Sequence, residues 1–499
     1  MMAGFSSLWK PRSFGGRGHA ALRLAVVFLA VVAGALPANA AAPNVLFIAI
    51  DDLRADFGRA AGVGVRTPHL DAFAGTARVF HRHYVQVPTC GASRAALLRG
   101  KYPTLPAHIG NDAIRRTHPD WAGNSLPAVF RRSGYQTMAL GKVGHYPGGL
   151  TGNSWSKGPE ELPGAWDRHW IPETPWPSPQ ALMHGYARGS ARKSGVSPAW
   201  EAVDGPDESY PDAWIASAAV TALNGLAGQA DPWFFCVGFF KPHLPFAAPR
   251  KWHDLYAAAP GNLDRESVPG REDGISWHGS REFRGNYGHD GLDPSTDAEY
   301  ARQLRRAYAA CVSYVDAQVG RVLDALEAAG LAEKTIVVIW SDHGFLLGEH
   351  GIWGKHCLYE EALRSPLMIR LPGMPMAGKA SEGLVETVDL FPTLTDLCGV
   401  QAPPGLDGRS LRPQLIDPGA PGAEVARSFW TSGTRTIRTA EWRLTVSGSA
   451  GDAGHKVELF DHDTDPGELR NVAADHEEEV AKWMKVLENQ GPETPDRRK

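Results

Sequence analysis

Runs of apolar residues along the chain alternate with amphipathic helical patterns, and each run ends abruptly in polar residues. Four such runs predict buried strands, at residues 44–50, 136–140, 233–239 and 335–340. Apolar runs without polar alternation are typical of parallel strands that are buried on both faces. Because helical patterns separate these runs, we expect an α/β fold with a large, mostly parallel sheet flanked by helices.

The helical patterns lie between the predicted strands, at residues 125–132, 212–226 and 298–329. In the longest pattern, apolar residues recur every three or four positions and form one stripe. Gly330 follows the last residue of this predicted helix, and glycine is the commonest residue just after a helix C-terminus.

Polar residues follow each of the four predicted strands. The clusters are Asp51–Asp52, Lys142 with His145, Lys241–Pro242–His243, and Asp342–His343. The carboxyl ends of parallel strands meet at one edge of the sheet, where ligands bind in such folds. The clusters therefore predict a single site, and the carboxylates in it suit Ca²⁺ or Mg²⁺ better than zinc.

Outside these units the pattern changes twice. Long irregular stretches at 146–210 and 257–296 are expected to shape a pocket, because loops of this length are unusual unless they are functional. Four tryptophans there can stack on sugar rings, although packing is the plainer explanation for each: Trp155, Trp166, Trp170 and Trp176. After residue 405, short strand patterns at 434–439, 442–446 and 456–460 and a final helix at about 477–489 predict a smaller C-terminal α+β subdomain.

The first forty residues resemble a secretory signal, with a basic lead, an apolar core at 24–36 and a small-residue cleavage site at 38–40. The core is shorter than the roughly 20 residues of a membrane span, so an uncleaved anchor is the second interpretation. We predict a signal peptide at 1–40, a catalytic domain at 41–405 and the C-terminal subdomain at 406–499. The mature chain is expected to be exported to the periplasm or secreted, with no stable membrane span.

Charge narrows the possible partners. The formal net charge falls from −4 to −8 on cleavage, because four of the 51 basic residues and none of the 55 acidic ones precede residue 41. An acidic mature chain argues against nucleic-acid binding, which needs a broad basic surface.

Cys90 lies just before a short predicted helix, with Arg94 one turn further on the same face. The helix N-terminus and the guanidinium favour an anionic or polarised group at position 90. The four other cysteines form an even number in an exported protein, which leaves both disulfides and buried free thiols open: Cys236, Cys311, Cys357 and Cys398.

The segment Cys90-Gly-Ala-Ser-Arg94 resembles the signature of the type I sulfatases, which belong to the alkaline phosphatase superfamily. Ala92 stands where that signature usually has proline. Further segments resemble the iduronate-2-sulfatase branch: Gly-Lys142-Val-Gly-His145, Lys241-Pro-His243-Leu-Pro-Phe, and Gly-Glu-His-Gly-Ile-Trp-Gly-Lys355. The resemblance extends from about residue 43 to residue 471.

This resemblance implies that a sulfatase-maturing enzyme, such as the formylglycine-generating enzyme, oxidises Cys90 to formylglycine. It also implies one divalent ion, usually Ca²⁺ with Mg²⁺ possible, held by Asp51, Asp52, Cys90, Asp342 and His343. The remaining implied site residues are Arg94, which holds the nucleophile, Lys142 and Lys355, which bind sulfate, His243 as general acid and His145 as base.

The implied function is the removal of sulfate from a sulfated saccharide, with iduronate-2-sulfate as the nearest analogy. A formylglycine-dependent phosphonate or phosphate monoester hydrolase of the same superfamily is the first alternative. A catalytically inactive protein that binds sulfated glycans is the second, and the intact Cys90 argues against it.

Overall fold

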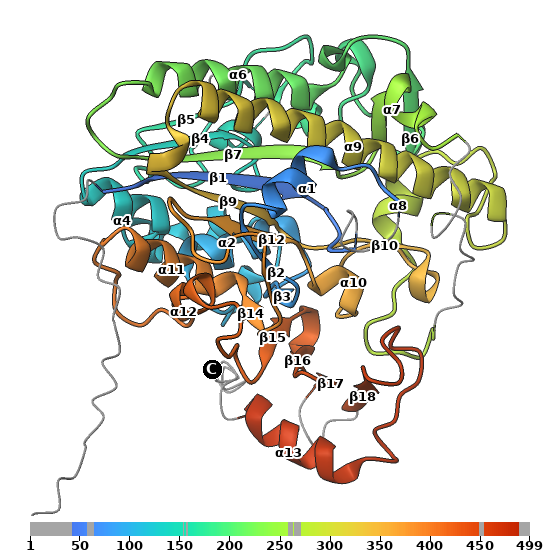
Figure 1. Cartoon of the computed structure of the whole chain (residues 1–499). Helices are drawn as coiled ribbons and strands as arrows, with labels where there is room; N and C mark the ends of the chain where they lie inside the picture. Colours follow the sequence, from blue (N-terminus) through green and yellow to red (C-terminus); the bar gives the residue numbers. More distant parts are fainter. Residues whose placement is uncertain are drawn as a thin grey trace, which may run out of the picture. The chain divides into compact units, whose positions relative to one another are not determined.

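An eight-stranded sheet lies at the centre of the computed structural model, which describes residues 42–488 apart from 57–63, 153, 156–157, 258–262, 264–270 and 449–453 (Figure 1). Its strand order is β13 (Ala380–Ser381), β2 (Arg78–Phe80), β12 (Leu367–Arg370), β9 (Thr335–Ser341), β1 (Asn44–Asp51), β7 (Trp233–Pro242), β4 (Gln136–Gly141) and β5 (Arg168–Trp170). The run from β9 to β5 is parallel, whereas β12 pairs antiparallel with β9 and β2. The predicted mostly parallel sheet is confirmed.

The strand β1 is buried along its whole length between β7 and β9, which explains its unbroken apolar sequence. Its side chains alternate between two hydrophobic clusters on opposite faces of the sheet. Leu46, Ile48 and Ile50 pack in the cluster that contains the long helices, and Val45 and Phe47 pack in the other. The four predicted strands are present, and β7 continues three residues beyond its predicted end, to Pro242.

Helices cover both faces of the sheet, as expected for an α/β fold (Figure 1). On one face lie α1 (Pro68–Ala74), α6 (Pro211–Leu226) and α9 (Ala298–Ala328). On the other face lie α2 (Cys90–Arg99), α4 (Leu126–Arg132), α11 (Leu390–Leu397) and α12 (Arg412–Ile416). The side chain of Asp297 caps α9 by accepting from the Tyr300 N–H at 2.9 Å.

Shorter elements join these layers. The remaining helices before the C-terminal region are α3 (Ala113–Thr117), α5 (Pro179–Met183), α7 (Arg250–Asp254), α8 (Arg281–Asn286) and α10 (Glu360–Leu363). Three two-stranded sheets pair β10 (Leu346–Leu347) with β11 (Trp353–Gly354), β3 (His83–Tyr84) with β14 (Val385–Glu386), and β6 (Trp200–Val203) with β8 (Phe246–Pro249).

The four tryptophans considered for stacking on sugar rings pack into the protein. Trp176 is buried and donates from its indole nitrogen to the Tyr186 carbonyl at 3.0 Å. Trp170 stacks on Phe235 of the central sheet. Trp155 and Trp166 are partly buried against the hydrophobic clusters, so packing explains all four.

The C-terminal region forms a separate four-stranded antiparallel sheet, with β15 (Ala426–Phe429), β16 (Arg435–Arg438), β17 (Trp442–Ser447) and β18 (Lys456–Asp461). The helix α13 (Glu477–Glu488) buries Trp483 and Leu487 against it. The smaller α+β region is thus present, and β15 is a strand that the sequence pattern did not indicate. The boundary between residues 405 and 406 stays a prediction.

Three further expectations from the sequence concern the signal peptide, a membrane span and the state of the cysteines. The predicted signal peptide at 1–40 lies outside the described residues. Among the described helices, none combines the length and the apolar character needed to span a bilayer. All five cysteines are buried free thiols, which decides between the two alternatives left open above.

Candidate active site

The ends of β1 and β9 bring three carboxylates together. Asp51 ends β1, Asp52 follows it in a left-handed conformation with φ of 59°, and Asp342 follows β9. Because β1 and β9 are adjacent parallel strands, their carboxyl ends lie side by side. The backbone N–H of Asp52 donates to Oδ1 of Asp342 at 3.2 Å, and all three side chains are fully buried.

Four of the five predicted metal ligands form one group. Asp51, Cys90, Asp342 and His343 each offer a ligand atom within 4.8 Å of the others. His343 places its Nε2 atom 3.3 Å from the Cys90 sulfur. The fifth predicted ligand, Asp52, lies in an overlapping group with Cys90 and His243 instead. Buried carboxylate oxygens are the donors that Ca²⁺ and Mg²⁺ prefer, so Asp51 and Asp342 suit the predicted ion.

Arg94 connects the helix that carries Cys90 to both strands. Its Nε donates to Oδ2 of Asp342 at 3.0 Å, and its Nη2 lies 3.4 Å from Oδ1 of Asp51. Its Nη1 also donates to the Lys142 carbonyl. Because the guanidinium of Arg94 has a partner for each of its three nitrogens, it is fixed in one orientation.

Two lysines provide the other positive charges of the site. Lys142 binds Oδ2 of Asp51, and Lys355 contacts both oxygens of Asp52, at 3.0 and 2.9 Å. Burial alone would raise the pKa of Asp51, but the charges of Lys142 and of its neighbours outweigh burial and hold that pKa well below its usual value. Burial alone would lower the pKa of Lys355, but the negative groups around it, Asp52 first, together outweigh burial and raise that pKa well above its usual value.

The backbone beside Cys90 is closely packed. A Cβ atom at Gly91 would lie 2.0 Å from the Asn111 carbonyl oxygen, so only glycine fits there. The Asn111 side chain accepts from the Gly91 N–H at 3.2 Å. Burial, followed by the negative charge of Asp51, raises the pKa of the Cys90 thiol well above its usual value.

His145 lies on the loop after β4, where Glu161 holds the backbone. The carboxylate of Glu161 accepts from the N–H groups of His145 and Tyr146, at 2.9 and 3.1 Å. The ring Nδ1 of His145 is buried without a hydrogen-bond partner in the described part of the chain. Burial and the charge of Lys142 lower its pKa to about 3, so the imidazole is neutral.

The side chains of Lys241, near the end of β7, and His243, in the turn that follows β7, contact different groups. His243 points toward Asp52, with Nε2 and Oδ2 4.0 Å apart. The ammonium group of Lys241 instead donates to the carbonyls of His243 and Pro245, at 3.0 and 2.6 Å. Lys241 therefore stabilises the backbone of this turn. It is not one of the predicted catalytic residues.

Glu282 is a site residue that the sequence analysis missed. It lies on α8, in the second long irregular stretch, and contacts two predicted catalytic residues. Its Oε1 lies 3.4 Å from Nε2 of His243, and its Oε2 lies 3.3 Å from the ammonium nitrogen of Lys355. The stretch was expected to shape the pocket, but one glutamate in it carries no periodic signal that marks its place.

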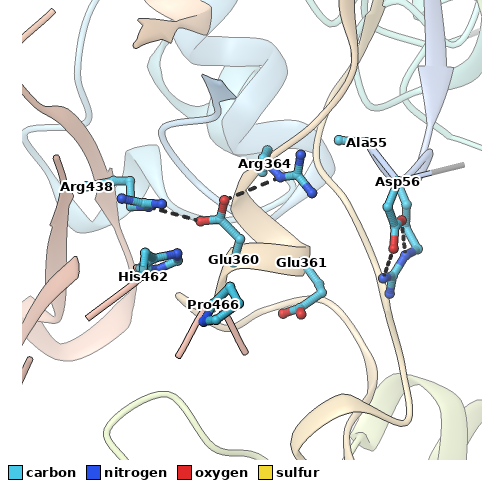
Figure 2. A pocket seen from close by; sticks show the side chains of 9 residues that line it. Ala55, Asp56, Glu360, Glu361, Arg364, Arg438, His462 and Pro466 are labelled. Atoms are coloured by element: carbon cyan, nitrogen blue, oxygen red, sulfur yellow. Dashed lines mark hydrogen bonds and ion pairs between the residues drawn. The ribbon is translucent and has the colours of Figure 1, made fainter. Parts of the chain in front are cut away.

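A second group of charged side chains surrounds a pocket of about 280 Å³ beside α10. Figure 2 shows Glu360 between Arg438 and Arg364, with His462 and Glu361 close by. Glu360 and His462 also form a potential metal group with Glu468. None of the predicted catalytic or metal residues lines this pocket.

The comparison with protein families identifies the chain. The sulfatase family model matches residues 43–400, and a model described as N-sulphoglucosamine sulphohydrolase, C-terminal, matches residues 348–490. The chain therefore belongs to the sulfatase family, whose members are hydrolases that act on sulfate esters.

Relatives of known function agree with this assignment. A sulfatase of Formosa agariphila is 31% identical over 386 residues, which cover 74% of this chain and 72% of that protein. Iduronate 2-sulfatase of Homo sapiens is 31% identical over 427 residues, which cover 78% and 75%. Among solved structures, a phosphonate monoester hydrolase from Silicibacter pomeroyi has a TM-score of 0.69 at 26% identity and covers 90% of this chain and 94% of its own.

Proposed function

We propose that this chain is an exported sulfatase that removes sulfate from a sulfated sugar by means of a formylglycine made from Cys90. The observation that carries the proposal is the position of Cys90 in one buried group with Asp51, Asp342 and His343. Arg94, one turn along the same helix, is fixed by two of these carboxylates. The identity of 31% with human iduronate 2-sulfatase supports a sugar sulfate as substrate.

Asp51, Asp52, Cys90, Asp342 and His343 would hold one divalent ion, for which we propose Ca²⁺. Such an ion, when bound, supplies Lewis-acid polarisation of an ester oxygen and stabilises the nucleophile. Lys142 and Lys355 place their ammonium groups beside Asp51 and Asp52, where they can neutralise charge that develops on sulfuryl oxygens.

Two histidines supply proton transfer in this proposal. His243 gives its proton to the sugar oxygen that leaves, because an alkoxide is a poor leaving group. Among the described residues, Nδ1 of His145 has no hydrogen-bond partner, which leaves a ring nitrogen open to take a proton from the hydroxyl that formylglycine retains. Arg94 keeps the attacking group oriented throughout.

The alternative is a formylglycine-dependent phosphonate monoester hydrolase, and the likeness to the Silicibacter pomeroyi enzyme favours it. Both reactions need a nucleophile, a divalent ion and cations around a tetrahedral oxyanion, so the cluster alone serves either one.

A release assay separates the two reactions. Purified protein, co-expressed with a sulfatase-maturing enzyme, is given a panel of defined sulfated saccharides, including iduronate-2-sulfate disaccharides, and a phenyl phosphonate monoester. We expect sulfate release with the highest kcat/KM on one of the sugars, and no release by Cys90→Ala. A higher kcat/KM on the phosphonate would assign the alternative function.

A further inference from the structure

Glu282 connects two residues that arrive from different parts of the fold. His243 follows β7 and Lys355 follows β11, and Glu282 faces one with each of its oxygens, at 3.4 and 3.3 Å. The opposing charges, Lys355 first, hold the pKa of Glu282 well below its usual value although burial acts the other way. An ionised carboxylate therefore lies between two groups with separate tasks in the proposed reaction.

The helix that carries Glu282 is anchored to the strand that leads to Lys355. The backbone N–H of Trp353 in β11 donates to the Ser280 hydroxyl at 2.8 Å. Phe283 is fully buried and stacks on the Trp353 ring, with centroids 5.8 Å apart. Residues 280 and 283 are therefore held on β11, and the position of Glu282 between them is set by packing.

The two ring nitrogens of His243 have different partners. Its Nδ1 lies 2.6 Å from the Leu244 carbonyl oxygen, which only accepts, so Nδ1 carries hydrogen. Its Nε2 faces Glu282 and is the atom available to a substrate. A carboxylate beside Nε2 fixes the rotation of the ring, as partners of ligand histidines do in metal sites.

We propose that Glu282 is a positioning residue that holds Nε2 of His243 and the ammonium group of Lys355 at a set separation. Through these two contacts, Glu282 positions both groups around the same ester. His243 is the proton donor for the leaving oxygen, and Lys355 is the ligand for the sulfuryl oxygens. Both contacts are longer than a strong charge-assisted hydrogen bond, so an ester oxygen can take the donor without breaking a tight pair. This inference rests on the function proposed above.

The test compares Glu282→Gln, which keeps the shape and removes the charge, with the wild type on a sugar sulfate and an activated aryl sulfate. The matched control is Glu272→Gln, an exposed glutamate of the same irregular stretch. We expect kcat/KM of Glu282→Gln to fall roughly 10- to 100-fold on the sugar sulfate and much less on the aryl sulfate, because a phenolate leaves with little protonation. The control is expected to match the wild type on both.

Double variants show whether Glu282 acts through His243. In a His243→Ala background, Glu282→Gln should have a smaller further effect on the sugar sulfate than in the wild type, because only its contact with Lys355 remains. Full additivity, or equal losses on the two substrates, would overturn the inference. Glu282→Asp keeps the charge on a shorter side chain and is measured in the same way if the amide variant does not fold.

The outcomes also separate this inference from the proposed function. A wild-type protein with complete formylglycine that releases no sulfate from any substrate overturns both. A wild type that is active, with a Glu282→Gln variant that keeps its activity on sugar sulfates, overturns only the role of Glu282.

Discussion

Two clusters of charged side chains in this protein each combine carboxylates, cations and histidine, and they differ in arrangement. The strand-end cluster contains Asp51, Asp52, Cys90, Arg94, Lys142, Asp342, His343 and Lys355, and the α10 cluster contains Glu360, Arg364, Arg438, Arg443, His462 and Glu468. Each has at least three side chains whose ligand atoms lie within 4.8 Å of one another. From residue composition alone, both clusters would be predicted to bind a metal ion.

In the α10 cluster, a guanidinium already occupies the place of a cation. Arg443 binds Glu468 through Nε and Glu360 through Nη2, and its own side chain is 1% exposed. The hydroxyl of Tyr84 also donates to Glu360 at 2.9 Å. Arg443 lies on β17 and Glu360 on α10, so the cluster joins the C-terminal sheet to the rest of the chain.

In the strand-end cluster, Arg94 also bridges two carboxylates, Asp51 and Asp342, but these carboxylates lie in one group with Cys90 and His343. Lys142 and Arg94 take different oxygens of Asp51, and the group still converges on Cys90. The difference lies in what else the carboxylates meet: the strand ends bring Asp51 and Asp342 to Cys90 at the start of α2, whereas Glu360 and Glu468 meet arginines and His462.

Replacing one carboxylate in each cluster should give the largest difference between the two clusters. We expect Asp342→Ala to lose the bound divalent ion and all measurable sulfate release together, because the ion loses a ligand and Arg94 loses a partner at 3.0 Å. Metal content by mass spectrometry and activity are measured on the same samples. Glu360→Gln is the counterpart in the α10 cluster and should keep both, and stoichiometric metal in Asp342→Ala would refute the assignment.

The second-largest effect is expected for His243→Ala. Its loss on a sugar sulfate should be roughly 10²- to 10⁴-fold, the usual range for a general acid, and much smaller on an aryl sulfate. Steady-state kinetics on the two substrates measure the difference. Equal losses, with metal and formylglycine intact, would instead indicate that His243 binds sulfate.

Arg443→Met should affect stability and leave the chemistry unchanged. It removes the buried cation that Glu360 and Glu468 share and leaves them only Arg438, Arg364 and His462, which costs up to about 3–5 kcal/mol, the range for breaking a buried pair. Thermal unfolding is expected to occur at a clearly lower temperature, while kcat of the folded fraction stays that of the wild type. A loss of kcat at an unchanged unfolding temperature would place the α10 cluster in the active site.

The smallest effect concerns pH and Glu161. Burial raises its pKa to about 7 from an ordinary value of 4.5, so the folded state resists its ionisation. Stability from this group is complete below pH 4.5 and is lost as the pH rises toward 7, a loss of up to about 3 kcal/mol. Glu161→Gln has no such group, so its unfolding temperature should fall less between these pH values, and equal slopes for both proteins would contradict the prediction.

The sequence predicted those parts of the fold and site that leave a local signal. Buried parallel strands such as β1 appear as continuous apolar runs, and the residues that follow them are then easy to place at one edge. The spacing of Cys90 and Arg94 on one helix face is local in the same way, and the structure brings both to the carboxylates.

The missed features depend on contacts between distant segments. Glu282 lies in an irregular stretch, and its contacts with His243 and Lys355 follow from how α8 packs on β11. Arg443 and Glu360 are 83 residues apart, so nothing in either segment marks the pair. β15 is a strand of four residues that forms only by pairing with β16.

The measurement that tests the central claim most directly is the chemical state of Cys90 against activity. Preparations made with and without a sulfatase-maturing enzyme are digested, the peptide from His83 to Arg94 is analysed by mass spectrometry, and sulfate release is measured on each. We predict that activity is proportional to the formylglycine fraction and absent when only thiol is found. Full activity in a preparation with only unmodified thiol at Cys90 would contradict the account.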